Sequence, residues 1–536
     1  MPKNIIIFSD GTGQAGGIKF DEARTNVYKL YRACRVAPDT SIDPTEQVAF
    51  YDAGLGSAAD GGHFKLGFLR SLYNFASMAT GLGITKNIID CYAAIIRLYE
   101  DGDRIFLVGF SRGSYTVRSL AGVLALCGIP RNLPGIKPLP LDEAGSQKLA
   151  EHAVKGVYQF CPSYDRLKIG PYGTFLMDTR VAIAAKFRAE HGCSNNSATS
   201  EGANMFPYCI GVFDTVAALG HTGLSFVVMA LIGLVAALSP LLTEALIAWL
   251  KDLFNIWGFA TWKYAPGYFD LLWFFLPAYF LCALYLYFKN YLKWAPSLVG
   301  YNWLKRMQTM HLTEFKQRFY DVTLNPNVNY ARHAISIDEN RADFVRVPWK
   351  PSGAMKTPVD SAGNTCFEQI WFPGVHADVG GGYDENNSRL SDIALKWMLA
   401  SMSIIPNGLK HDPTVLNLHP VPTGRQHDEQ AGNWLKLGIR TIHDPKSPIH
   451  KSVYQRFAAK SVLLFNHMSR YRPENMCEHV DFVQYFDPNN TDPKPTDPTQ
   501  CMASDVEARW EKALGQSAKP SRPIFTASQT APPFLR

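Results

Sequence analysis

The sequence predicts an α/β fold: a mostly parallel sheet with helices on both faces, interrupted by an inserted apolar helical hairpin. Short β-rich runs alternate with helical periodicity over the first 220 residues, and turn residues close most of these runs. The same alternation resumes after about residue 300. The 536 residues are 47% hydrophobic and 19% charged, which allows a large core and excludes a predominantly disordered or fibrous chain.

The expected elements follow one another as strand, turn and helix. The strand at 4–8 ends in the turn residues D-G-T-G, and the helix at 84–99 ends at D-G-D. In chain order we expect strands at 4–8, 47–51, 104–108 and 208–213, with helices at 84–99 and 114–126 among them. Beyond the apolar segment, α/β character returns over 303–341, followed by a strand at 366–371 and a helix at 391–403.

The apolar segment contains two runs without a charged residue. One run of 20 residues covers 224–243, and one of 18 residues covers 271–288. At about 1.5 Å per residue, each run could cross or nearly cross a hydrocarbon layer of about 30 Å. We expect a hairpin that enters or grips a membrane, or that acts as a lid. The alternative is a pair of buried core helices.

Three further features restrict the class of protein. The early apolar run at 5–8 is followed by serine, aspartate and glycines, which is not typical of a signal peptide. Ten scattered cysteines without a C-x-x-C pair favour reduced thiols in a chain made in the cytoplasm. A net charge of +6 without a long Lys/Arg block does not indicate a nucleic-acid partner.

The G-F-S-R-G segment at 109–113 fits the pattern G-x-S-x-G. This pattern is typical of a nucleophile elbow, a strained strand-to-helix turn that exposes a serine hydroxyl above an α/β-hydrolase sheet. The bare pattern is weak, but here it lies between an expected strand and an expected helix. We therefore expect Ser111 to be the nucleophile, with the amides of Ser111 and Arg112 at the helix N-terminus facing an anion.

A serine nucleophile needs a base, and the base needs an orienting carboxylate. In α/β-hydrolases the chain order is serine, acid, histidine. Asp214 ends the expected strand at 208–213, where an open α/β sheet assembles its site, so we expect it to be the acid. Its alternative role is a helix N-cap.

His376 is the expected base among fourteen histidines. It follows an expected strand and precedes a triple glycine, which permits close backbone approach to a ligand. His333 is the rival, but it lies inside an expected helix or strand.

The segment G-T-G-Q-A-G at 11–16 matches the dinucleotide pattern G-x-G-x-x-G. The helix that should open within this motif is missing from the pattern, and so is the acidic residue at the end of a second strand. An oxyanion hole is a better use, because its second amide comes from a loop after an early strand. Gly11 or Thr12 would supply that amide and Asp10 would brace the loop; a purely structural turn is the alternative.

Five motifs together carry a resemblance to a known family. They are F-S-D-G-T at 8–12, G-F-S-R-G at 109–113, G-V-F-D-T-V at 211–216, A-R-H-A-I-S-I-D-E at 331–339 and F-P-G-V-H-A-D-V-G-G-G-Y at 372–383. In this order they resemble the signatures of the first class of type VI secretion lipase effectors, which are α/β-hydrolases with a G-x-S-x-G elbow. The resemblance covers about residues 1–220 and 305–395. Phe213 stands where the family often has Trp, and Ser9 where it often has Cys.

The resemblance implies phospholipase activity against bacterial membranes, delivery by a secretion spike protein and neutralisation by a cognate immunity protein. It implies Ser111 as nucleophile, Asp214 as acid and His376 as base. We expect an acyl-ester hydrolase of the phospholipase A1/A2 type that needs no metal or cofactor and associates with the target cell envelope. The alternative is a membrane-anchored binding or scaffolding protein with an unused hydrolase fold.

The chain is therefore expected to have four segments. Residues 1–220 and 301–405 are the two parts of the catalytic domain, and residues 221–300 are the membrane-inserting or lid hairpin. Residues 406–536 form a C-terminal region whose role is open, with four prolines in 487–499 that predict an extended arm.

Overall fold

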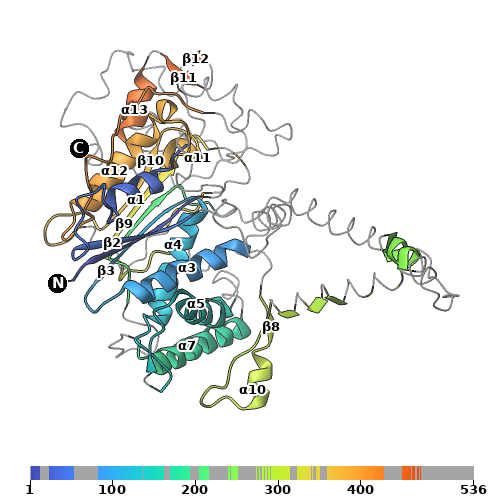
Figure 1. Cartoon of the computed structure of the whole chain (residues 1–536). Helices are drawn as coiled ribbons and strands as arrows, with labels where there is room; N and C mark the ends of the chain where they lie inside the picture. Colours follow the sequence, from blue (N-terminus) through green and yellow to red (C-terminus); the bar gives the residue numbers. More distant parts are fainter. Residues whose placement is uncertain are drawn as a thin grey trace.

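The computed structural model describes a central α/β domain and parts of the segments around it (Figure 1). The residues it describes are 2–11, 23–53, 82–135, 137–161, 170–193, 205–216, 240–241, 243–250, 273, 277, 281–282, 284–285, 288–289, 291–313, 323–339, 341, 346–349, 359–427, 450–459, 461–464, 467–469 and 471.

A six-stranded sheet in the order β10-β9-β6-β3-β1-β2 forms the centre of the domain. All neighbouring strands pair in parallel. The strands are β1 (Asn4–Ser9), β2 (Gln47–Asp52), β3 (Arg104–Phe110), β6 (Cys209–Phe213), β9 (Tyr330–Ser336) and β10 (Phe367–Phe372). Because all strands run the same way, their carboxyl ends meet at one edge, where α/β sheets assemble their sites.

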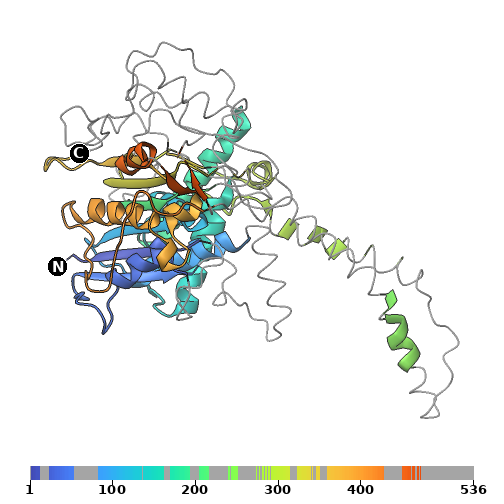
Figure 2. The ribbon, with the colours of Figure 1, turned by 90° about the horizontal axis from the view of Figure 1, so that it is seen from above.

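Helices cover both faces of this sheet, as Figures 1 and 2 show. One face carries α1 (Asn26–Cys34) and α12 (Ser391–Ser403); the other carries α3 (Leu82–Leu98), α4 (Arg112–Cys127), α5 (Glu143–Glu151) and α7 (Pro171–His191). Alternate side chains of β1 serve the two cores: Ile5 and Ile7 pack on the α3 side, and Ile6 and Phe8 on the α1 side. Burial of β1 on both faces explains its continuous run of isoleucines.

Shorter elements extend this core. They are the ribbon β4 (Asn132–Leu133) with β5 (Lys137–Pro138), η2 (His152–Val157), η3 (Tyr158–Phe160), the ribbon β7 (Leu292–Lys293) with β8 (His311–Leu312), α10 (Trp303–Gln308), α11 (His376–Gly380), η4 (Glu385–Asn387), α13 (Lys451–Ala458) and the ribbon β11 (Val462–Leu464) with β12 (His467–Ser469).

The predicted α/β class and its mostly parallel sheet are confirmed. The expected strands differ from the observed ones by one or two residues, and helix α12 has the bounds predicted from its periodicity. The segment around His376 differs from the prediction, because it forms the short helix α11 instead of a loop. The Asp378 side chain accepts a hydrogen bond from the Val375 amide at the start of this helix and thereby stabilises its first turn.

The inserted apolar segment lies mostly outside the described residues, and so do most of its two uncharged runs. Within the described part of the chain, no helix is both long and apolar enough to cross a membrane. The helical turns at 243–250 lie well away from the sheet in both ribbon views. Strands β6 and β9, which precede and follow the segment, are hydrogen-bonded neighbours, so the chain returns to the same sheet after it.

Candidate active site

Ser111 lies at the sharp turn between β3 and α4, with φ 57° and ψ −119°. A serine with positive φ is strained, and such strain is typical of a site residue held by its surroundings. The turn fits only because its flanking residues are glycines. A Cβ on Gly109 would lie 2.6 Å from the Gly113 carbonyl oxygen, and a Cβ on Gly113 would lie 2.0 Å from the Ser9 carbonyl oxygen. The two glycines of G-x-S-x-G are therefore required by backbone contacts.

The Ser111 amide is not available to an oxyanion, because it donates to the Phe213 carbonyl at 3.1 Å. This differs from the expectation that the Ser111 and Arg112 amides act together. The elbow is thus tied to the end of β6, and the Ser114 hydroxyl adds a second hydrogen bond to the same carbonyl at 2.9 Å. Arg112, the first residue of α4, remains the elbow's candidate donor, and burial lowers the pKa of its side chain to about 10.

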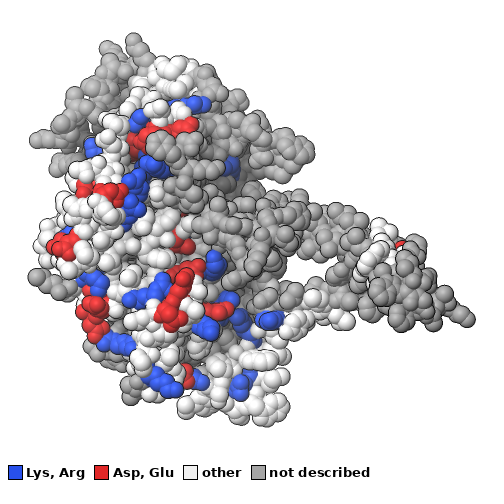
Figure 3. Space-filling model, viewed as in Figure 1, with Lys and Arg blue, Asp and Glu red and all other residues white. Residues whose placement is uncertain are grey.

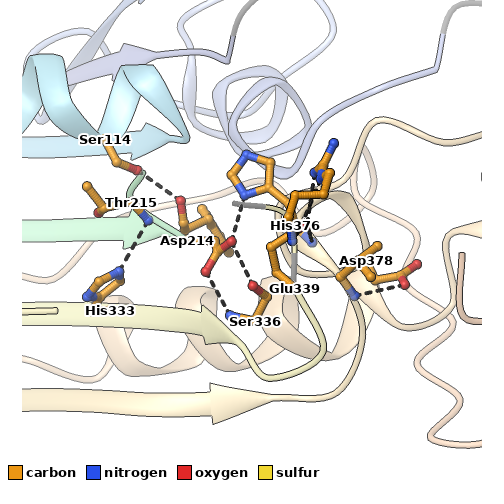
Figure 4. A network of polar contacts seen from close by, with 11 residues as sticks. Ser114, Asp214, Thr215, His333, Ser336, Glu339, His376 and Asp378 are labelled. Carbon is orange, nitrogen blue, oxygen red and sulfur yellow. Dashed lines mark hydrogen bonds and ion pairs between the residues drawn. The ribbon is translucent and has the colours of Figure 1, made fainter. Parts of the chain in front are cut away.

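Asp214 and His376 meet at the carboxyl edge of the sheet (Figure 4). His376 Nδ1 lies 2.6 Å from Asp214 Oδ2, and both side chains are buried. Burial is the largest influence and raises the pKa of Asp214, but the hydrogen bond from His376 and the charges of His376 and Arg346 outweigh it and hold that pKa below its ordinary value. Asp214 is therefore an ionised carboxylate that can accept the Nδ1 hydrogen and stabilise an imidazolium.

Ser336 holds the Asp214 carboxylate from the neighbouring strand. Its amide donates to Oδ1 at 2.8 Å, and its hydroxyl donates to Oδ2 at 2.7 Å. With His376, the carboxylate thus accepts three hydrogen bonds from described residues. The sequence reasoning missed Ser336, although its place at the end of β9, beside the end of β6, is the signal that could have found it.

Glu339 supports His376 from the backbone side. Its buried carboxylate accepts the His376 amide at 3.1 Å and also binds the Arg341 guanidinium at 2.8 Å. Burial raises the pKa of Glu339 most, but the hydrogen bonds and charge of Arg341 hold it below its ordinary value. This residue was also missed as a site residue, because it lies 37 positions from His376 in the chain.

Phe110 joins the elbow to the histidine. Its ring centroid lies 4.7 Å from that of His376, and Phe110 directly precedes Ser111. A Cβ on Gly380 would lie 1.9 Å from the Phe110 ring, and a Cβ on Gly381 would meet the backbone of residues 24–26. The triple glycine therefore permits close approach to the protein's own chain, which corrects the interpretation that it faces a ligand.

His333, the rival base, has a structural position. It lies inside β9, fully buried, with Nδ1 3.0 Å from Gln369 Oε1 and Nε2 3.4 Å from the Thr215 amide (Figure 4). The amide N–H can donate only to an unprotonated Nε2, so the ring is neutral. Burial lowers the pKa of His333 to about 3.

The expected oxyanion loop is described only up to Gly11, and Thr12 lies outside the described residues. The Gly11 amide donates to Asp10 Oδ1 at 2.7 Å and would have to leave that oxygen to face an oxyanion. Asp10 Oδ2 accepts the Thr25 hydroxyl at 2.6 Å and the Tyr51 hydroxyl at 2.7 Å, so Asp10 links the described start of this loop to α1 and β2.

The arrangement has the parts needed for acyl transfer. A serine at a strained elbow, a histidine packed against that elbow and a buried carboxylate on the histidine lie at one edge of the sheet. Such a set can carry out nucleophilic attack with general base assistance.

Comparisons with known proteins identify a family for this fold. Residues 3–230 and 298–401 match the family model "T6SS, Phospholipase effector Tle1-like, catalytic domain", which covers more than half of the chain. An uncharacterized protein of Saccharomyces cerevisiae, YEL023C, is 30% identical over 130 residues, which are 24% of this chain and 18% of that protein.

Two solved structures are similar at lower identity. An uncharacterized protein from Pseudomonas aeruginosa has 15% identity and a TM-score of 0.31, over 78% of this chain and 48% of that one. The Tle1 effector bound to the VgrG spike of the type 6 secretion system has 13% identity and a TM-score of 0.25, over 73% of this chain and 53% of that one. The chain thus spans about half the length of these two proteins and less than a fifth of the yeast protein.

Proposed function

Because the chain belongs to the Tle1-like family of type VI secretion phospholipase effectors, we propose that it is a serine phospholipase whose catalytic residues are Ser111, Asp214 and His376. The observation that carries the proposal is the 2.6 Å hydrogen bond between His376 Nδ1 and Asp214 Oδ2 beside the strained Ser111 elbow. A buried carboxylate on one imidazole nitrogen leaves the other nitrogen to exchange protons with a serine.

The proposed mechanism has two acyl-transfer steps. His376 Nε2 takes the proton of Ser111 Oγ while Oγ attacks the ester carbonyl carbon, and the resulting oxyanion is held by backbone amides that include Arg112. His376 then gives the proton to the departing alcohol oxygen, which leaves an acyl-enzyme. Water, deprotonated by His376, attacks the acyl-enzyme and releases the fatty acid. Asp214 stabilises the imidazolium in both steps.

We assign the substrate as a phospholipid acyl ester, cleaved in the A1/A2 manner to a fatty acid and a lysolipid. The family model names a phospholipase effector, and an acyl-enzyme mechanism is suited to carboxylic esters. Loss of one acyl chain from many lipids would damage a bacterial envelope, which fits an antibacterial role.

Membrane association is part of this proposal. The inserted segment at 221–300 is proposed as a hairpin that enters or grips the target bilayer, and the described residues next to it have a suitable surface. In α10 no residue is buried, and Trp303, Leu304 and Met307 are exposed beside Lys305 and Arg306. Figure 3 shows this part of the surface as uncharged and basic. Aromatic and basic side chains together favour the headgroup region of a membrane.

Delivery and partners are proposed from the family. The neighbour bound to a VgrG spike suggests a spike protein as carrier, and a producing cell would need a cognate immunity protein against its own effector. We propose delivery by type VI secretion from the cytoplasm to the target cell envelope.

The test is hydrolysis by the purified full chain with and without a serine-directed fluorophosphonate. The first substrate is a soluble short-chain p-nitrophenyl ester; the second is a vesicle of defined phosphatidylethanolamine and phosphatidylglycerol, with the released fatty acid and lysolipid identified by mass spectrometry. The proposal predicts inhibitor-sensitive hydrolysis of both and labelling of Ser111. Binding to vesicles with no turnover and no labelling would instead favour a binding protein with an unused hydrolase fold.

A further inference from the structure

Segments beyond residue 405, which the sequence left without a role, reach the turn that leads from β10 into His376. The His450 amide donates to the Trp371 carbonyl at 2.9 Å, and the His450 ring stacks on Phe372 with centroids 4.6 Å apart. Figure 1 shows α13, β11 and β12 lying over this end of the sheet. The turn itself, residues 372–376, carries the proposed base.

One contact runs through Asp338, a half-buried residue two positions beyond the end of β9. Asp338 Oδ2 accepts the Gly374 amide at 2.6 Å and the Tyr471 hydroxyl at 2.8 Å. The Asp338 amide in turn donates to the Gly374 carbonyl at 3.1 Å. Gly374 has φ 104°, and a Cβ there would lie 2.3 Å from Asp378 Cβ, so this turn requires glycine. Tyr471 thus completes a link from the C-terminal region to the residue two positions before His376.

A second contact runs through Asp378, two positions after His376. Asp378 Oδ2 accepts the Val375 amide at 3.1 Å and the His427 amide at 3.0 Å, and Oδ1 lies 2.7 Å from His427 Nδ1. The His427 ring also stacks on Tyr383, with centroids 3.5 Å apart. The turn before His376 and the first turn of α11 are therefore each held by a carboxylate that also binds the C-terminal region.

Arg456 joins the two contact points into one unit. Its buried guanidinium lies 4.9 Å from the Tyr471 ring centroid and donates to the Gly424 carbonyl at 2.7 Å and to the Leu463 carbonyl at 3.3 Å. The segment at 421–427, which carries His427, is thereby tied to α13, β11 and Tyr471. In a connected polar network of this kind, the loss of one member leaves buried groups unsatisfied.

We propose that the described residues of 421–427 and 450–471, here called the C-terminal clamp, position the base of the reaction, with Tyr471 and His427 acting on His376 through Asp338 and Asp378. The inference rests on the proposed function for its chemistry. We assign no substrate contact to Tyr471 or His427; both are positioning residues. A base must be held to a fraction of an ångström for proton transfer, and small displacements of catalytic groups can cost about a hundredfold in rate.

The test compares Tyr471→Phe with a matched control, Tyr330→Phe, in the full chain. Both variants remove only a hydroxyl that donates to an aspartate, but Tyr330 binds Asp360 at 2.5 Å from the first residue of β9, at the opposite edge of the sheet. We expect Tyr471→Phe to lower kcat on a soluble ester about tenfold with KM nearly unchanged, and Tyr330→Phe to leave kcat within about twofold of the parent.

A second readout does not depend on turnover. Hydrogen–deuterium exchange of the peptide covering 372–380 should become at least about tenfold faster in Tyr471→Phe, while exchange of β1 stays unchanged in both variants. A double-mutant cycle with Asp338→Asn completes the set. If Tyr471 acts through Asp338, the double variant should lose little more kcat than the worse single variant.

The outcomes separate this inference from the proposed function. A wild-type chain without esterase activity, but with faster exchange at 372–380 in Tyr471→Phe alone, would refute the hydrolase proposal and retain the clamp. Unchanged exchange at 372–380 in Tyr471→Phe would overturn the clamp, whatever the esterase activity. Equal kcat losses in Tyr471→Phe and Tyr330→Phe would also overturn it, because the effect would then be general destabilisation.

Discussion

His376 Nδ1 lies 2.6 Å from Asp214 Oδ2, although the two residues are 162 positions apart in the chain. The whole inserted segment at 221–300 lies between them, so the chain leaves the sheet after β6 and returns to it as β9. Parallel pairing of β6 with β9 places Asp214 beside Ser336. Strand β10 pairs with β9 in parallel, and the few residues after it bring His376 to the same edge of the sheet. The pair is therefore a product of strand order.

The first prediction concerns the nucleophile and the base. Ser111→Ala and His376→Ala should each remove nearly all hydrolysis of a soluble ester, and the double variant should lose little more, because triad members act as a unit. The elbow should still fold, since alanine is smaller than serine. Initial rates, with circular dichroism to verify folding, provide the measurement. Near-normal turnover by folded Ser111→Ala would refute the mechanism.

The second prediction separates two aspartates near the histidine. Asp214→Asn should lower kcat by up to about 10⁴ with a small effect on KM, since an amide cannot fix the imidazole tautomer or stabilise its cation. Asp378→Asn is the matched change: it alters the brace of α11 and should cost far less. A larger kcat loss for Asp378→Asn, with Asp214→Asn nearly silent, would show that the acid is wrongly assigned.

The third prediction concerns the close backbone contact at the elbow. Gly113→Ala should destabilise the protein by about 3 kcal/mol or more, because the new methyl group would lie 2.0 Å from the Ser9 carbonyl oxygen. Gly156→Ala is the control, since the nearest atom to its new methyl group belongs to the exposed side chain of His152, 2.9 Å away, which can move. Urea unfolding measures both. Equal stabilities would contradict the packing argument.

The fourth prediction concerns pH and Asp52. Burial, the largest influence, together with the charge of Asp90, raises the pKa of Asp52 to about 8 against the hydrogen bonds from Ser9 and Asn87. Between about pH 4 and pH 8 the Asp52 carboxyl keeps its proton in the folded chain and loses it in the unfolded chain. Protonation of Asp52 therefore stabilises the fold fully at low pH, and this contribution is lost as the pH rises toward 8.

An asparagine at position 52 resembles the protonated carboxyl and does not titrate, so it gives the stability no pH dependence of its own. The stability of Asp52→Asn relative to wild type should therefore rise by about 1 kcal/mol per pH unit from pH 5 to pH 8. Thermal unfolding across this range measures it, with the exposed Asp178→Asn as control. A pH-independent difference between wild type and Asp52→Asn would contradict the prediction.

The fifth prediction concerns the inserted segment. Replacing residues 222–290 with a short soluble linker should preserve hydrolysis of soluble esters and greatly lower activity on vesicles, since the proposed hairpin brings the site to the lipid surface. Vesicle co-sedimentation of the intact chain and both assays test it. A replacement variant that is misfolded and inactive on both substrates, with no liposome affinity of the intact chain, would show that the segment forms core helices.

The sequence by itself determined the fold class and the elements that carry the site. Burial on both faces produces apolar runs, and helix faces repeat every 3.6 residues, so strands and helices can be recognised from local pattern alone. The elbow was also accessible, because G-x-S-x-G between a strand and a helix is a local signal. Chain order and its place at a strand end singled out Asp214, and the local context of a strand running into a glycine-rich segment favoured His376 over His333.

Only the tertiary structure decided which polar groups hold Ser111, Asp214 and His376, and which close backbone contacts require the glycines. Ser336 binds Asp214, Glu339 binds His376 and Tyr471 binds Asp338. Each contact joins strands or segments that are distant in sequence, and no local pattern encodes it. For the same reason, the sequence did not reveal that the Ser111 amide donates to the Phe213 carbonyl. Periodicity specifies which face of an element is buried, whereas the partners of a buried polar group depend on strand order, which is fixed only when the whole sheet has assembled.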